Sequence, residues 1–311
     1  MSYRRLSASI GGFIAFGAFL RPLPAGPDPV DAALHAHPWS RPLLLPYALP
    51  LTGFARGASM VPYAMPSSVR YLLVLCALAL PRTIVAQTPG EFTEMRHGLA
   101  DAIERGVNIA RRRSGGPAID PRVIEAMRKV PRHEFAPRDL QPYAYLDRPL
   151  TVGHDATISQ PSLVAVMTDL LKIEKEHKVL EVGAGGGYHS AILAEMAAEV
   201  FSVEFHKDVA EAATRTLARL GYGKVRVNVA DGYYGWRPGA LYDAILVRMA
   251  VPEISSALLS QLKPGGRLIA PVGPADRGQI LVVLQKDMDG NVTEFPIMPV
   301  VFRALPGGMR L

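Results

Sequence analysis

A glycine-rich stretch at residues 183–187 constrains the fold of this chain more than any other feature. It follows an apolar run at 178–182, which has the length of a buried strand, and it leads into a predicted helix at 188–197. Glycines at positions 183, 185 and 187 permit a tight turn and leave room for a ligand against the backbone, because they carry no side chain. The stretch therefore predicts a strand–loop–helix ligand site, although a tight turn without a ligand would use glycine for the same reason.

Strand-like and helix-like segments alternate after Pro161. The predicted strands lie at residues 178–182, 199–203, 225–229, 242–247 and 267–272, and the predicted helices at 162–171, 188–197, 208–220 and 252–262. This order predicts an α/β fold with a mostly parallel, doubly wound sheet that helices cover on both faces. Two later strand-like runs, at 279–285 and 300–303, predict an antiparallel edge to that sheet.

Acidic residues follow the second and third predicted strands. Glu204 comes about 20 residues after Gly183, the spacing of a carboxylate that accepts hydrogen bonds from ribose hydroxyls. Asp231-Gly232 ends the third strand, where a carboxylate can accept from an adenine amino group and glycine lets the ring lie on the backbone. Open α/β sheets bind ligands at the carboxyl ends of their strands, so we expect the loop and both acids to form one site.

The loop and its acids resemble the class I (Rossmann-like) methyltransferases. An acid, Glu181, stands two residues before Gly183, and the glycine spacing differs from the GxGxxG pattern of NAD-dependent enzymes. The resemblance implies S-adenosyl-L-methionine as the cofactor. It assigns cofactor binding to Glu181, Gly183, Gly185, Gly187, Glu204, Asp231 and Gly232.

The segment before the loop carries a more specific resemblance. Residues 144–161 read Ala-Tyr-Leu-Asp-Arg-Pro-Leu-Thr-Val-Gly-His-Asp-Ala-Thr-Ile-Ser-Gln-Pro, which resembles the signature of the protein-L-isoaspartate (D-aspartate) O-methyltransferase family. Segments 130–135, 231–236 and 261–268 continue the resemblance, which covers about residues 91–311. Thr157-Ile158-Ser159 is its most specific part, because most class I methyltransferases lack this element.

This resemblance implies protein repair by methyl esterification of the α-carboxylate of L-isoaspartyl residues, and of some D-aspartyl residues, in damaged proteins. The ester cyclises to a succinimide, whose hydrolysis returns part of the residues to aspartate. A carboxylate is already ionised at neutral pH and needs no general base, so the site must align the reacting atoms and exclude water.

We expect Ser159 to be the catalytic residue that orients the accepting carboxylate, with Thr157, Ile158 and Gln160 binding the substrate. Taken alone, Ser159 could also be the N-cap of a helix that starts at Pro161. His154 could be a base, but carboxyl methylation needs none, so we assign it no catalytic role.

The chain departs from the family pattern near both predicted sites. The usual Gly-Thr-Gly-Ser-Gly-Tyr-Gln loop is Gly-Ala-Gly-Gly-Gly-Tyr-His here and ends at His189. The usual Thr-Ala-Ala after the fourth strand is Arg248-Met249-Ala250, and Asp155 replaces a common glutamine. Two alternatives therefore stay open: a class I methyltransferase with another acceptor, and a non-catalytic cofactor-binding homologue.

The N-terminal third has a different composition. Residues 1–64 predict a disordered leader or a spurious upstream extension, and 65–90 carry an apolar run at 71–80 that resembles an export signal. We expect a methyltransferase domain over 91–311, with a helical, substrate-binding part at 91–160 and the Rossmann-like cofactor part at 161–311. We expect a cytoplasmic enzyme, with export through residues 65–86, or anchoring by them, as the alternative.

Charge and cysteine content exclude several partners. Residues 1–90 hold seven arginines and two acids, or +5 of the net charge of +6, so residues 91–311 form no basic nucleic-acid surface. A single cysteine, Cys76, and eight histidines without metal-ligand spacing indicate no metal site. We expect a monomer whose partners are isoaspartyl peptides and proteins.

Overall fold

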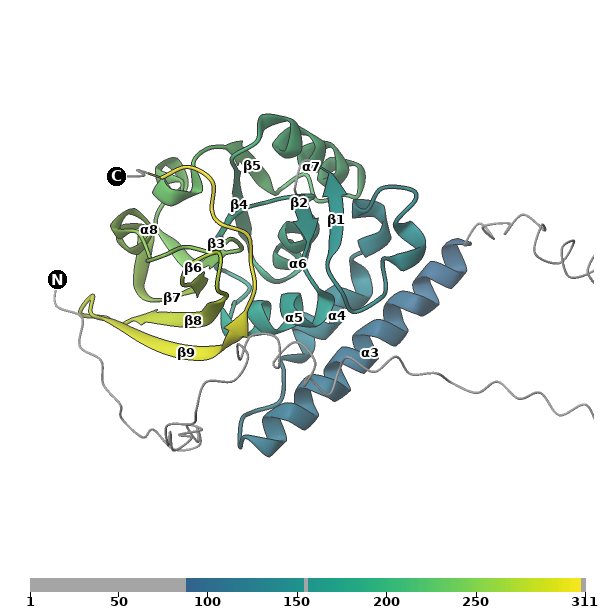
Figure 1. The fold of residues 1–311 in the computed structure, drawn as a ribbon, viewed down its shortest axis with the longest axis horizontal. Coiled ribbons are helices and arrows are strands. Elements are labelled where there is room, and N and C mark those ends of the chain that lie inside the picture. The colour runs from purple at the N-terminus through teal and green to yellow at the C-terminus, as the bar shows by residue number, and fades with distance from the viewer. Residues whose placement is uncertain (1–87, 154–155, 309–311) are drawn as a thin grey trace, which may run out of the picture. The chain divides into compact units, whose positions relative to one another are not determined.

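The computed structural model describes residues 88–153 and 156–308. The predicted leader at 1–64, the signal-like run at 71–80, and His154 and Asp155 lie outside the described residues. A seven-stranded sheet in the order β5-β4-β3-β6-β7-β8-β9 forms the centre of the described part (Figure 1). The strands are β3 (Lys178–Val182), β4 (Glu199–Glu204), β5 (Arg226–Val229), β6 (Tyr242–Val247), β7 (Leu262–Val272), β8 (Gln279–Lys286) and β9 (Val292–Val300).

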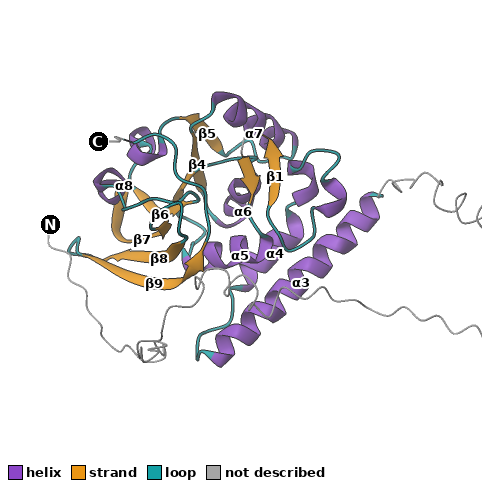
Figure 2. Cartoon of the chain, in the orientation of Figure 1, coloured by secondary structure: helices purple, strands orange, loops and turns teal. Residues whose placement is uncertain are grey.

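The first five of these strands pair in parallel, while β8 and β9 each run antiparallel to their neighbour. Helices cover both faces of the sheet, with α3 to α7 on one side and α8 on the other (Figures 1 and 2). The helices are α3 (Pro89–Arg113), α4 (Pro121–Lys129), α5 (Pro161–Leu170), α6 (Tyr188–Met196), α7 (Lys207–Arg219) and α8 (Ser256–Gln261). The predicted α/β class and antiparallel edge are confirmed.

Two apolar cores flank the sheet, because successive residues of a strand point to opposite faces. Val179 belongs to the core beneath α3 to α7, whereas its neighbour Leu180 belongs to the core beneath α8. The first core joins residues of both predicted parts of the domain, from Phe92 on α3 to Ile269 on β7. The two predicted parts, 91–160 and 161–311, thus share one core in the described residues.

Helix α3 begins at Pro89, where Thr88 and Glu91 form a reciprocal capping box. Three predicted boundaries were wrong. Strand β7 begins at Leu262 instead of at residue 267. Helix α8 starts only at Ser256, capped by the Ser255 hydroxyl. The last strand is β9 at 292–300 instead of 300–303; its prolines are tolerated because it lies at the edge of the sheet.

A hairpin that the sequence did not predict precedes the sheet. Strands β1 (Leu150–Gly153) and β2 (Ala156–Ile158) pair antiparallel, with Thr151 opposite Thr157. Short 3-10 helices connect the larger elements: η1 (Arg132–Phe135), η2 (Gln141–Tyr143), η3 (Gly232–Tyr234) and η4 (Arg237–Gly239). The hairpin places the Thr157-Ile158-Ser159 element directly before α5.

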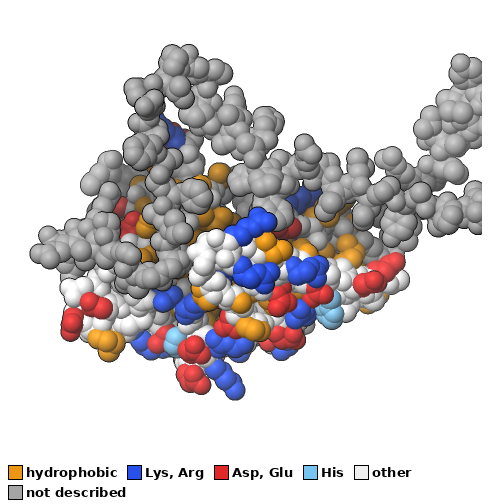
Figure 3. Space-filling model, turned by 90° about the horizontal axis from the view of Figure 1, so that it is seen from below, with side chains coloured by type: hydrophobic (Ala, Val, Ile, Leu, Met, Phe, Trp, Pro, Cys, Tyr) orange, Lys and Arg blue, Asp and Glu red, His pale blue; other side chains and the backbone are white. Residues whose placement is uncertain are grey.

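The molecular face in Figure 3 intersperses Lys and Arg with Asp and Glu side chains, so no single sign of charge dominates the part of it that is described. Among residues 88–153 and 156–308, no helix has both the length and the apolarity required to cross a membrane.

Candidate active site

The loop between β3 and α6 is the first part of the site. Gly183, Gly185 and Gly187 all adopt positive φ angles, of 91°, 52° and 90°. The amides of Gly183 and Ala184 donate to the Val203 carbonyl of β4, at 2.8 and 3.1 Å. Glycine is required at these positions because side chains rarely adopt such φ values, and the predicted tight turn is therefore present.

Glu204 ends β4 beside this loop. Its carboxylate accepts hydrogen bonds from the backbone N–H groups of Gly185, at 2.9 Å, and of His206, at 3.1 Å. Each oxygen therefore makes one bond, and a carboxylate oxygen has two lone pairs. One acceptor position on each oxygen is left for a ligand.

Asp231 follows β5 and is the N-cap of η3. Its oxygens accept from the amides of Tyr233, at 2.9 Å, and of Gly308, at 2.8 Å. A Cβ atom on Gly232 would collide with the Val182 side chain of β3, so only glycine fits there. No motif or spacing indicates that the C-terminal segment lies next to Asp231.

Glu181 lies inside the protein, beneath the glycine loop. It is fully buried and accepts from the hydroxyls of Ser190 and of Ser202, the latter at 2.7 Å. Its other oxygen pairs with Nη1 of Arg248 at 3.0 Å. Glu181 thus supports the loop from below.

Arg132 fixes the segment that contains Ser159. Its fully buried guanidinium donates to three backbone carbonyl oxygens: Ala144 at 2.8 Å, Ser159 at 2.9 Å and Arg148 at 3.2 Å. The same guanidinium lies 5.0 Å from the centre of the Tyr188 ring of α6. One side chain therefore joins the predicted substrate segment to the helix after the glycine loop.

Ser159 is not the N-cap of α5, so that alternative interpretation was wrong. Gln160 occupies the N-cap position without a side-chain capping bond. The free backbone amide of Ser162 donates to Asp147 at 2.8 Å, and Asp147 also accepts from the side-chain Nε2 of Gln160 at 3.1 Å. The Ser159 hydroxyl is therefore not used to cap the helix.

Ile158 is only 1% exposed and belongs to the core. A Cβ atom built on Gly186 would lie 3.9 Å from its side chain, and one built on Gly185 would lie 3.6 Å from the Thr157 carbonyl oxygen. The Thr157–Ser159 element therefore packs directly against the glycine loop.

His189, where the family pattern has glutamine, is buried on the first turn of α6. The Thr168 hydroxyl donates to the Val164 carbonyl, so it accepts from His189 Nε2 at 2.9 Å. Among the described residues, Nδ1 has no hydrogen-bond partner. Burial, and then the positive charge of Arg248, hold the pKa of His189 well below its ordinary value.

We expect His189→Gln to reduce the acid sensitivity of folding. Below about pH 6.5, His189 binds a proton in the unfolded chain but not in the folded one. The free energy of unfolding therefore decreases as the pH is lowered, by up to about 1.4 kcal/mol per pH unit. Between pH 7.5 and 5.5 the native chain should lose about 1 kcal/mol more than the variant in urea titrations. Exposed His97→Gln on α3 is the control, and equal losses in all three proteins would contradict the assignment.

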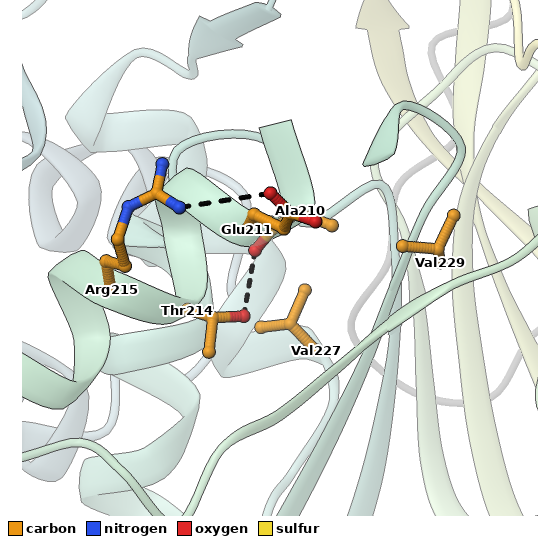
Figure 4. Close-up of a pocket in the computed structure, with 6 residues that line it drawn as sticks. All are labelled: Ala210, Glu211, Thr214, Arg215, Val227 and Val229. Atoms are coloured by element: carbon orange, nitrogen blue, oxygen red, sulfur yellow. Dashed lines mark hydrogen bonds and ion pairs between the residues drawn. The ribbon is translucent and has the colours of Figure 1, made fainter. Parts of the chain in front are cut away.

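A surface pocket lies between α7 and the edge strand β5 (Figure 4). It is lined by Ala210, Glu211, Thr214, Arg215, Val227 and Val229. None of these belongs to the predicted cofactor or substrate residues. The candidate site is instead defined by the strand ends and the Thr157–Ser159 element.

Comparisons with known proteins agree with this geometry. The family model described as protein-L-isoaspartate(D-aspartate) O-methyltransferase matches residues 108–309. The chain belongs to this family. Protein-L-isoaspartate O-methyltransferase 2 of Syntrophobacter fumaroxidans is 45% identical over 242 residues, which are 78% of this chain and 98% of that protein. The corresponding Polaromonas protein is 48% identical over 201 residues, or 65% of this chain and 95% of its own length.

Solved structures show the same fold. A protein-L-isoaspartate O-methyltransferase structure matches with a TM-score of 0.61 and 29% identity, covering 68% of this chain and 66% of that chain. A Plasmodium falciparum protein in complex with S-adenosyl-L-homocysteine matches with a TM-score of 0.57 and 23% identity, and shows the fold alone. The predicted family, enzyme class and fold are confirmed, and S-adenosyl-L-methionine is the cofactor of this methyltransferase family.

The described residues fit this cofactor. The glycine loop presents backbone without side chains, and Glu204 offers acceptor positions at the end of the adjacent strand. Asp231 and Gly232 stand at the end of β5, the next strand along the sheet. Of the features that an adenosyl group needs, the structure thus supplies acceptors for the ribose hydroxyls at Glu204. The space beside Gly232 is filled by the side chains of Val182 and Leu305.

Proposed function

We propose that this chain transfers a methyl group from S-adenosyl-L-methionine to the α-carboxylate of L-isoaspartyl residues in proteins, with Ser159 orienting the carboxylate. One observation carries the assignment of the site: the Thr157–Ser159 element lies directly against Gly185 of the loop that serves the cofactor. An acceptor held by Ser159 is therefore adjacent to the donor.

The cofactor supplies an electrophilic methyl group on a sulfonium ion. The protein does not need to remove a proton, since the accepting carboxylate is ionised at neutral pH. Ser159 donates a hydrogen bond to one carboxylate oxygen and leaves the other directed at the methyl group. Ser159 is only 9% exposed, so its surroundings also keep water from the attacking oxygen. Orientation and desolvation are then the main contributions of the protein.

The predicted ligand residues serve different parts of the cofactor and of the substrate. Glu204 binds the ribose hydroxyls, Asp231 and Gly232 bind adenine, and Gly183, Gly185 and Gly187 bring backbone close to the cofactor. Glu181 acts through the loop, which it supports from within the core. Thr157 and Gln160 shape the entrance for the peptide, and Ile158 holds the element in place by packing.

The test is transfer of a labelled methyl group to an isoaspartyl peptide, beside the same peptide with normal aspartate. We expect a base-labile methyl ester on the isoaspartyl peptide only. Equal labelling of both peptides, or transfer only to a small molecule, would establish a different acceptor. Cofactor binding without transfer to any acceptor would establish a non-catalytic homologue.

Replacing Ser159 with alanine should lower kcat/KM for the isoaspartyl peptide by about ten- to hundred-fold, because one hydrogen bond to a charged oxygen is lost. Cofactor affinity, measured by calorimetry, should stay unchanged. Ser260→Ala, an exposed serine on α8, is the control and should keep native kinetics. Native kinetics in Ser159→Ala would remove this residue from the mechanism.

We also propose that the enzyme acts in the cytoplasm as a monomer. S-adenosyl-L-methionine is expected to be made and used in that compartment, which favours it over export. N-terminal sequencing of the mature protein tests this location: a chain that starts near Thr88 would indicate an exported enzyme. Light scattering of the purified protein tests the oligomeric state, and a dimer mass would overturn the monomer.

A further inference from the structure

Arg248 stands where the family pattern has a small residue, and it links the two halves of the site. It directly follows β6 and is only 7% exposed. Its Nη1 donates to the carbonyl oxygens of Gly183, at 2.9 Å, and of Ala184, at 3.1 Å, as well as to Glu181. Its Nη2 faces the Thr157 carbonyl at 3.4 Å and the Ser159 hydroxyl at 3.5 Å.

The three nitrogens of the Arg248 guanidinium differ in their hydrogen bonds. Nη1 makes three close contacts, whereas both contacts of Nη2 are long and weak. Among the described residues, Nε is buried without a partner. Because a guanidinium always carries five N–H donors and a full charge, Arg248 has donor capacity left, and the weak bonds are those toward Ser159.

The contact with Ser159 has only one possible polarity. A guanidinium has no acceptor, so Nη2 donates and the Ser159 oxygen accepts. The hydroxyl proton of Ser159 therefore points away from Arg248 and is available to a different acceptor. A hydroxyl that accepts from a cation is also a stronger donor, since neighbouring hydrogen bonds polarise one another.

We propose that Arg248 is a positioning residue that sets the specificity of Ser159 for a carboxylate acceptor. It holds the Ser159 hydroxyl with its proton toward the substrate and makes this hydroxyl a stronger donor to the accepting anion. Glu181 fixes the guanidinium from the opposite side and keeps the buried pair neutral. This inference rests on the proposed function and adds a residue that the family pattern does not contain.

Arg248 should act mainly on substrate binding. The accepting carboxylate is an anion before transfer and a neutral ester afterwards, so the Ser159 hydroxyl that Arg248 polarises favours the bound substrate at least as much as the transition state. The loss of such an interaction raises KM and changes kcat less. The contacts of Nη1 with the loop could in addition affect the cofactor, so both affinities have to be measured.

The experiment compares Arg248→Lys, Arg248→Thr and the double variant Glu181→Gln/Arg248→Thr in the full chain. At saturating cofactor we expect KM for the isoaspartyl peptide to rise by about ten- to hundred-fold in Arg248→Thr. The dissociation constant of the cofactor should rise less than KM does, although Gly183 and Ala184 lose a donor; an equal or larger rise would mean that Arg248 acts through the loop and would overturn the proposal. The KM of Arg248→Lys for the peptide should lie between the values for Arg248→Thr and for the native chain. The control is Arg277→Thr, at an arginine whose side chain is 82% exposed.

A double-mutant cycle with Ser159→Ala separates positioning from a merely structural role. If Arg248 acts through Ser159, Arg248→Thr should add little to the effect of Ser159→Ala. The proposal would be overturned if the fold-changes of Arg248→Thr and Ser159→Ala multiplied in the double variant. An unchanged KM in Arg248→Thr would overturn it as well. Arg248→Thr leaves Glu181 without its partner and could fail to fold. In that case KM and the dissociation constant of the cofactor are measured in Glu181→Gln/Arg248→Thr and in Arg248→Lys instead. A native chain that does not methylate the isoaspartyl peptide would instead overturn the proposed function.

Discussion

Replacing Glu204 with glutamine is expected to weaken cofactor binding by about ten- to hundred-fold. The carboxylate accepts from the amides of Gly185 and His206 and has one acceptor position left on each oxygen. A glutamine side chain has one oxygen and one NH2 group, so one of the backbone or ribose donors would face another donor. A lost hydrogen bond to a charged group corresponds to about 1.5–3 kcal/mol. Isothermal titration calorimetry with S-adenosyl-L-homocysteine measures the change.

Glu199→Gln is the matched control for that experiment. Glu199 belongs to the same strand, β4, but lies at its opposite end, where its carboxylate is 43% exposed and pairs with Lys178 and Arg226. Exposed pairs of this kind contribute little, so affinity should stay native. If both variants bound the cofactor equally well, Glu204 would have no part in ribose recognition.

Replacing Arg132 with methionine is expected to lower the free energy of unfolding by about 3 kcal/mol. Methionine fills part of the space but donates no hydrogen bond, so the carbonyls of Ala144, Ser159 and Arg148 would be left without this donor. Each unsatisfied buried group costs about 1–3 kcal/mol. The charged guanidinium is itself costly to bury, and burial lowers the pKa of Arg132 for this reason. Removing the charge therefore offsets part of the lost stability. In a thermal melt, Tm should fall by about 6–12 °C.

The control for Arg132 is Arg215→Met on α7. Its side chain is 72% exposed, and its nitrogen lies 3.9 Å from Glu211, so its removal should change stability by less than about 0.5 kcal/mol. We also expect Arg132→Met to impair methyl transfer, since the Ser159 carbonyl would lose its anchor. Native stability in Arg132→Met would mean that the three carbonyls find water instead, and that Arg132 does not fix the substrate segment.

The α/β fold, the glycine loop and the two acids at the strand ends could all be predicted from the amino-acid sequence. These features follow from local rules. Strand and helix periodicity predict a parallel sheet, and a parallel sheet brings the residues after successive strands to the same edge. Gly183, Glu204 and Asp231 could therefore be grouped without knowing any side-chain contact. The Thr157–Ser159 element was placed by its resemblance to a family.

The contacts that hold the site together could be seen only in the folded protein. Arg248 and Ser159 are 89 positions apart in the chain, and Gly308 and Asp231 are 77 apart. Arg132 reaches three carbonyls on separate turns, and Asp147 caps a helix that begins fourteen residues later, at Pro161. No periodicity or spacing encodes such pairs, because they depend on which loops the packed sheet and helices bring into contact. Local sequence patterns specify secondary structure and strand order, but a buried polar side chain acquires its partners only when the core closes around it.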